Sequence, residues 1–124
     1  MKTKIGYKIV YESGHKLYSL TFKLKYLGFK GSIRYYFQSW VFPRIGMGPL
    51  AVFEDKLSAR TFLYKFSCSY GNDCNRRNIR LYECEYVPSR GIHLFWSKNK
   101  YDKRDDLPDG TVLAKSVKLL KWLH

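Results

Sequence analysis

Hydrophobic and polar residues alternate along the first part of the chain. Tyr7, Ile9 and Tyr11 alternate with Lys8 and Val10, and the Ser-Gly-His sequence at residues 13–15 supplies a turn. A second alternating run follows, and its large side chains fall on one face: Tyr18, Leu20, Phe22, Leu24 and Tyr26. Because the side chains of a strand point to its two faces in turn, both runs predict strands, and the turn between them predicts a hairpin.

The middle of the chain predicts two more strands and a helix. Residues 33–42 are dense in aromatic and β-branched residues and predict a third strand. The glycines and prolines of residues 43–49 predict a loop, and the apolar residues 50–53 suit a short buried strand. Asp55 is a plausible N-cap, because its carboxylate can accept from the free amides of a first helical turn. Apolar residues then recur at helical spacing up to about residue 66: Leu57, Ala59, Phe62, Leu63 and Phe66.

The second half of the chain is less regular. Residues 67–78 are rich in asparagine and predict a loop, and the alternation in residues 79–87 predicts a strand. A turn, a short strand at residues 92–96 and a charged loop at residues 97–106 are expected next. The last residues, from 111 onward, fit a helix through Leu113, Val117 and Leu120 but are also β-branched as in strands. These elements predict a single domain, residues 1–124, of the α+β class: a mostly antiparallel β-sheet packed with one main α-helix.

Several short segments resemble a small uncharacterised family found in prokaryotes and their viruses. The resemblance is carried by residues 7–10, 41–43, 48–53, Ala59, 81–85 and 107–120, the last of which contains the sequence GTVLAKSVKLL. The family implies a strand, helix, strand order and has no assigned activity. The resemblance therefore favours two short strands in the tail and a viral or mobile-element setting.

Composition makes a folded, basic protein the expectation. With 45% hydrophobic and 18% aromatic residues, the 124-residue chain has enough apolar surface for one core. Its 23 lysine and arginine residues against 10 aspartate and glutamate residues leave a net charge of +13. Such a charge on a small surface repels itself unless an anionic partner neutralises it, although a merely solvated surface is the alternative reading.

The cysteines and the N-terminal residues bear on the compartment. Cys68, Cys74 and Cys84 form an odd set, and the first residues lack the apolar run of a secretory signal. A reducing compartment is expected, namely the cytoplasm, or the host cytoplasm if the protein is viral. No run approaches the roughly 20 apolar residues of a membrane span, so no membrane partner is expected.

Catalytic and metal-binding motifs are weak. Cys68, Cys74, Cys84 and His93 could in principle bind zinc, but gaps of five, nine and eight residues differ from the close ligand pairs of structural zinc sites. No histidine lies close enough in sequence to activate a cysteine nucleophile. The glycines of residues 46–49 lack the helix and the Lys-Ser/Thr pair of a phosphate-binding loop. No metal and no cofactor are therefore expected.

Glu83 and Glu85 form a Glu-x-Glu sequence that is similar to the paired acids of some ADP-ribosyltransferases. The accompanying Ser-Thr-Ser strand of those enzymes is missing. Alternation places both acids on one strand face, where they can simply pair with lysine or arginine. A transferase is kept as an alternative, but no catalytic residue is assigned.

Basic residues interleaved with aromatic ones remain as the candidate binding surface. Cations neutralise phosphates, and flat rings accept unpaired bases. The predicted binding residues fall into three groups along the chain: Lys23, Lys25, Lys30, Arg34 and Tyr36; then Arg76, Arg77 and Arg80, near Tyr82; then Lys98, Lys100, Lys103 and Arg104, near Trp96 and Tyr101.

The leading hypothesis is a non-catalytic viral or mobile-element accessory protein that binds a polyanion, RNA or DNA, and acts against host defence on a nucleic acid or a nucleoprotein complex. The first alternative is an inhibitor that docks on an acidic surface of a host protein, since a positive field steers such an encounter. The second alternative is the ADP-ribosyltransferase-like enzyme. The sequence leaves the oligomeric state open.

Overall fold

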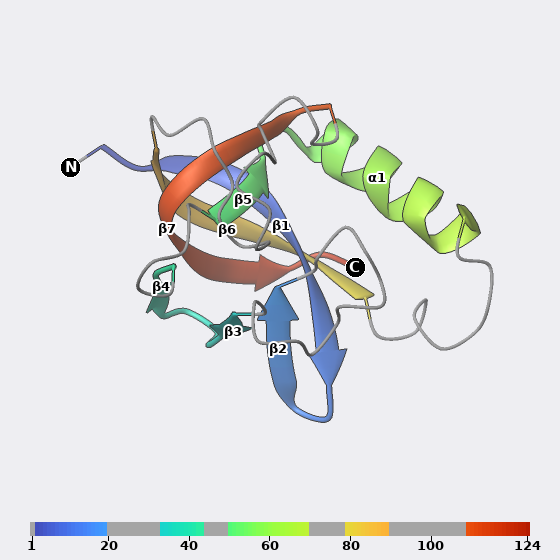
Figure 1. Ribbon diagram of the computed structural model, residues 1–124, viewed down its shortest axis with the longest axis horizontal. Coiled ribbons are helices and arrows are strands. Elements are labelled where there is room, and N and C mark those ends of the chain that lie inside the picture. Colours follow the sequence, from blue (N-terminus) through green and yellow to red (C-terminus); the bar gives the residue numbers. More distant parts are fainter. Residues whose placement is uncertain (1, 20–32, 44–49, 70–78, 90–108) are drawn as a thin grey trace, which may run out of the picture.

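The computed structural model describes residues 2–19, 33–43, 50–69, 79–89 and 109–124 (Figure 1). Strands account for more than half of these residues. The elements in chain order are β1 (Lys4–Ser13), β2 (Lys16–Ser19), β3 (Arg34–Tyr35), β4 (Trp40–Val41), β5 (Leu50–Phe53), α1 (Lys56–Ser69), β6 (Ile79–Pro88) and β7 (Thr111–Trp122).

Four antiparallel strands close into a barrel. β1 pairs with β6, β6 with β7, β7 with β5, and β5 returns to β1. Figure 1 shows β7 curving around the other three strands. The β6–β7 ladder shifts register between Glu83 and Cys84 and again between Val87 and Pro88. Such irregularities bend a strand and increase its twist, which lets a small sheet close on itself.

The predicted α+β class is wrong, because the described part of the chain is mostly β and is built around this four-stranded closed barrel. In an α+β fold the core lies between a sheet and its helices, whereas here the larger core cluster takes side chains from all four barrel strands, among them Val10, Val52, Cys84 and Val117. The helix covers only a smaller second cluster that includes Ile9, Phe53, Ala59, Ile79 and Leu81. Local patterns do not reveal closure, because it depends on pairings between distant strands.

The predicted hairpin is confirmed. β1 and β2 pair from Ser13 and Lys16 outward, and the turn between them consists of Gly14, with φ 64°, and His15. A glycine adopts this left-handed conformation without steric cost. The alternating run 18–26 is described only to Ser19, so most of that prediction lies outside the described residues.

The helix begins as predicted. The Ser58 amide donates to Asp55 Oδ2 at 3.0 Å, and the Ser58 hydroxyl donates to Oδ1 at 2.7 Å. These two bonds satisfy the N-cap role and lower the pKa of Asp55. The helix continues to Ser69, so Cys68 belongs to it and not to a loop. Leu57, which was expected on the buried face, is 74% exposed.

The remaining strands follow the prediction in part. The strands at residues 50–53 and 79–87 are confirmed as β5 and β6. The strand expected at residues 33–42 is interrupted by a turn and leaves only β3 and β4. The two strands expected in the tail are one continuous strand of 12 residues, β7. The predicted strand at 92–96 and the charged loop at 97–106 lie outside the described residues.

Candidate nucleic-acid interface

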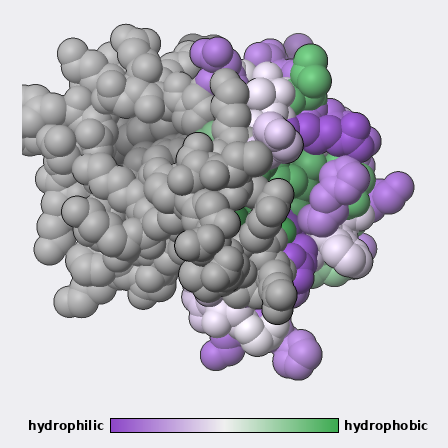
Figure 2. Space-filling view, turned by 90° about the vertical axis from the view of Figure 1, so that its right-hand side faces the viewer, coloured by the Kyte–Doolittle hydropathy of each residue, from purple (hydrophilic) through white to green (hydrophobic). Residues whose placement is uncertain are grey.

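Three of the predicted binding residues lie in the described part of the chain: Arg34, Tyr36 and Arg80. The others lie outside it: Lys23, Lys25, Lys30, Arg76, Arg77, Lys98, Lys100, Lys103 and Arg104. Figure 2, which faces the side of the molecule that carries α1, shows hydrophilic residues spread over the described part with hydrophobic residues between them. The candidate binding sites are therefore the places where a cation and an exposed aromatic ring meet.

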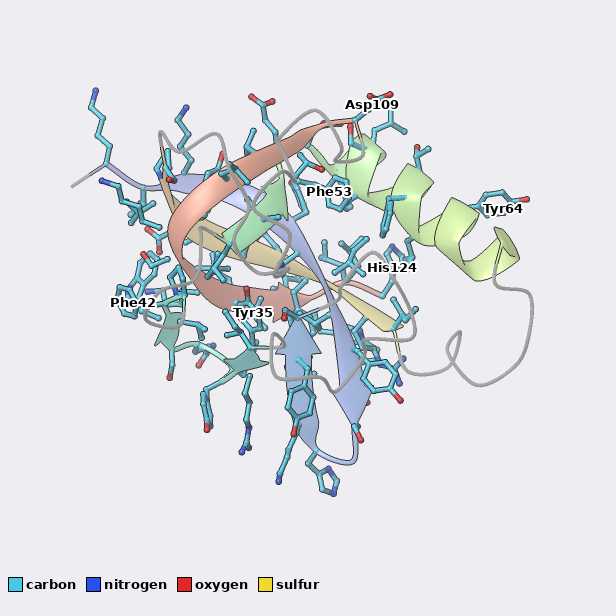
Figure 3. The ribbon with its side chains drawn as sticks, viewed as in Figure 1. Tyr35, Phe42, Phe53, Tyr64, Asp109 and His124 are labelled. Atoms are coloured by element: carbon cyan, nitrogen blue, oxygen red, sulfur yellow. The ribbon has the colours of Figure 1, made fainter. Side chains whose placement is uncertain are left out.

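Arg34 and Tyr36 belong to a short surface segment, residues 34–42, that we call the aromatic segment. Four of its large apolar side chains are exposed, with exposed fractions of 53% for Tyr36, 50% for Phe37, 36% for Trp40 and 64% for Phe42. Tyr35 and Val41 point the other way and are buried. In Figure 3, Phe42 lies at the outer edge of the molecule, whereas Tyr35 lies under β7. The segment thus presents a row of rings to solvent from a backbone fixed on its inner side.

Backbone hydrogen bonds hold the aromatic segment in this shape. Gln38 adopts a left-handed conformation with φ 62°, and its amide donates to the carbonyl of Leu119 on β7 at 2.9 Å. The Ser39 amide donates to the Tyr36 carbonyl at 3.0 Å and closes the turn. β3 pairs with β2, and β4 pairs with β7, so both ends of the turn are tied to the sheet.

Two cations lie against rings of the aromatic segment. The Arg34 guanidinium is 4.5 Å from the centroid of the Tyr36 ring, and Lys118 Nζ is 5.1 Å from the centroid of the Trp40 ring. Both distances are within the range of cation–π attraction. Arg34 is half-buried, and its Nε is buried without a hydrogen-bond partner among the described residues. The pairing places positive charge and stacking surface side by side.

Lys118 also connects the aromatic segment to the Glu-x-Glu sequence. Its Nζ lies 3.5 Å from Glu85 Oε1, while the Thr3 hydroxyl donates to the other oxygen of Glu85. The hydrogen bond from Thr3 and the charge of Lys118 lower the pKa of Glu85. Cys84, between the two acids, is fully buried in the barrel. Glu85 therefore serves the ion pair that alternation predicted, and we do not propose the transferase.

Arg80 is positioned differently from the prediction. Its guanidinium lies 3.3 Å from Glu12 Oε1 and donates to the Ile79 carbonyl at 3.2 Å. Tyr82, the ring expected to accompany it, is only 9% exposed. Arg80 thus forms an ion pair, as Lys118 does, but the ring beside it is buried. Arg76 and Arg77, the other basic residues of this predicted group, lie outside the described residues.

Lys8 is a buried cation that the sequence analysis did not identify. It is 7% exposed, its Nζ donates to the Ala51 carbonyl at 2.5 Å, and it lies 5.5 Å from the centroid of the Tyr35 ring. Burial lowers the pKa of Lys8 to about 8 and raises that of the neighbouring Cys84 to about 12. The signal was present in the sequence, because Lys8 shares its strand parity with the core residue Val10.

Other residues of the surface were also missed. Trp40 and Phe42 were assigned only to a strand, and Lys118 was assigned only to the ambiguous tail. Their common position depends on the pairing of Trp40 with Lys118 across β4 and β7, which joins residues far apart in the sequence. The aromatic density of residues 33–42 was the available signal.

Two of the four residues that could in principle bind zinc lie in the described part of the chain. Cys68 is on the helix, Cys84 is in the barrel core, and Cys74 and His93 lie outside the described residues. Among the residues that the structure describes, no cluster of histidine, cysteine and acidic residues could hold a metal ion. Within the same residues, no helix has the length and apolar character needed to span a membrane.

Comparison with known proteins gives no relative for this chain: no family model, no curated protein and no solved structure matches it.

Proposed function

We propose that the protein is a non-catalytic nucleic-acid-binding protein that holds single-stranded RNA or DNA on the aromatic segment. The observation that carries the proposal is the pairing of exposed rings with cations, Tyr36 with Arg34 and Trp40 with Lys118. Unpaired bases stack on such rings whatever their sequence, and adjacent cations neutralise the phosphates. A duplex hides the faces of its bases, so a single strand suits this surface better.

The net charge of +13 supports the same proposal. Release of counterions from the phosphates drives the binding of basic proteins to nucleic acids and makes it depend on salt. As part of this proposal, the protein acts as a viral or mobile-element accessory protein in the host cytoplasm, where it occupies nucleic acid needed by a defence complex.

Titration of a labelled oligonucleotide tests the proposal. Single strands of about 12 nucleotides, as DNA and as RNA, and a duplex of equal length suit the usual site sizes of such surfaces. We expect tighter binding of the single strands and a loss of affinity as salt increases. Trp40→Ala should weaken binding, whereas Tyr64→Ala, which removes a 70% exposed ring from the far side of the molecule (Figure 3), should not. Absence of binding at low salt would overturn the proposal.

A protein partner is the second candidate, and the exposure of Phe37 and Phe42 favours it. These side chains have no polar atom, and exposed apolar patches are typical of protein interfaces. An acidic surface on the partner would complement Arg34 and Lys118. Pull-down with and without nuclease separates the candidates, because a partner that survives nuclease and is lost in Phe42→Ala supports the protein interface.

A further inference from the structure

The half-buried Arg34 and the exposed Tyr36 are fixed from inside the barrel by the residue between them. Tyr35 is 2% exposed, and its ring packs with the core residues of the barrel. Its hydroxyl is buried without a hydrogen-bond partner among the described residues, so no directional bond locks this ring. β3 contains only Arg34 and Tyr35, which makes its pairing with β2 a short one. The position of the segment therefore depends on what contacts the Tyr35 ring.

Lys8 makes that contact. Its Nζ lies 5.5 Å from the centroid of the Tyr35 ring and is itself fixed by the hydrogen bond to the Ala51 carbonyl. Ala51 lies on β5, next to the point where the β1–β5 ladder is reduced to the single pair Tyr7 and Phe53. The ammonium thus links β1, β5 and β3 at a place where few backbone hydrogen bonds join these strands.

We propose that Lys8 is a positioning residue for the aromatic segment: its ammonium attracts the inner face of the segment through Tyr35 and so keeps Arg34 and Tyr36 in their stacked arrangement outside. The biological meaning of this inference rests on the proposed function, but the order of the segment can be measured without nucleic acid. A cation that is shielded from water attracts a ring more strongly than an exposed one. Burial of Lys8 therefore favours this role.

The attraction requires a charged amine, so it should depend on pH. The titratable groups that face Lys8 are Tyr35 on β3 and Cys84, Tyr82 and Tyr86 on β6, and burial raises the pKa of all four. Lys8, with a pKa of about 8, is the member of this set that titrates first as pH rises. No carboxylate forms an ion pair with it among the described residues. Lys8 is therefore charged in most molecules at pH 7, and its contact with the ring is tested at that pH.

Amide hydrogen exchange of the free protein tests the inference. The reporter is the Gln38 amide, whose bond to Leu119 closes the segment against β7. We expect Lys8→Met to lower the protection factor of this amide about threefold or more, as loss of a buried cation–π contact implies. Lys16→Met, an exposed lysine on β2, is the matched control and should leave it unchanged. Tyr35→Leu, which removes the ring from this contact and keeps an apolar side chain, should lower the same protection factor, so the inference stays testable if Lys8→Met fails to fold.

Oligonucleotide binding provides a separate second measurement. If the native chain binds, Lys8→Met should lose affinity about threefold although its side chain is buried away from the ligand. If the native chain does not bind, the proposed function fails while exchange at Gln38 still tests the inference. Unchanged protection of Gln38 in Lys8→Met, or in Tyr35→Leu where Lys8→Met does not fold, overturns the inference even where binding is seen.

Discussion

The Arg34 guanidinium lies over the Tyr36 ring, so one point of the surface combines a positive charge with a stacking face. The two side chains should nevertheless contribute to binding in different ways. A phosphate contact acts through counterion release, so its contribution to affinity decreases as salt increases. The contribution of a base stacked on a ring depends little on salt. Salt dependence can therefore separate their roles.

Arg34→Ala should reduce the slope of log affinity against log salt concentration by about 1, because one phosphate contact is lost. Tyr36→Ala should lower affinity by about 1 to 3 kcal/mol with the slope unchanged, because a stacked base is lost. Fluorescence anisotropy of a labelled single strand at several salt concentrations measures both quantities. Equal slopes for the native chain and Arg34→Ala would contradict the assigned contact.

Burial of Lys8 should make stability increase with pH. The pKa of Lys8 is about 8 in the folded chain and about 10.5 in the unfolded chain, so the unfolded state binds more protons between these values. The free energy of unfolding must then rise with pH in that window, in total by about 3 kcal/mol. Well below pH 8, Lys8 is protonated in both the folded and the unfolded chain, so its contribution to the free energy of unfolding does not change with pH.

Urea unfolding at pH 7.5 and pH 9.5 measures the effect, to which Lys8 contributes an increase of about 2 kcal/mol, partly offset by the raised pKa of Cys84. Lys8→Met should remove the increase, while Lys16→Met should keep it. The buried tyrosines act in the opposite direction at higher pH, because their raised pKa values make the folded state retain protons. The same change in stability with pH in the native chain and in Lys8→Met would show that Lys8 is solvated.

The local elements could be predicted from the sequence, but the barrel and the surface could not. The cap at Asp55 and the turn at Gly14 depend on neighbouring residues, and both were predicted. Closure depends on pairings such as Tyr7 with Phe53, which no periodicity specifies. The interface likewise requires Trp40 and Lys118 to meet across β4 and β7. Burial of Lys8 was not predicted for a related reason. Closure of the barrel buries the face of β1 on which Lys8 lies.

The thiol of Cys84 should be inert in the folded protein. The side chain is fully buried, and burial raises its pKa to about 12, so the reactive thiolate is nearly absent at neutral pH. Native protein treated with iodoacetamide should leave Cys84 unmodified, and protein unfolded in urea should be modified there. Mass spectrometry of the peptide that contains Cys84 distinguishes it from Cys68 and Cys74. Rapid native modification of this peptide would place the thiol outside the core.

Gly110 should be more sensitive to substitution than Gly14, although both have positive φ, 83° and 64°. A Cβ on Gly110 would overlap the side chain of Ser58 at the start of α1, whereas one on Gly14 meets nothing within 4 Å. Gly14→Ala should therefore cost only the left-handed backbone penalty of about 1 to 2 kcal/mol. Gly110→Ala should cost about 1 to 3 kcal/mol more, because Ser58 must move from its bonds with Asp55. Urea unfolding of the two variants measures the difference. Equal decreases in the free energy of unfolding would mean that the Ser58 side chain moves away without loss of stability.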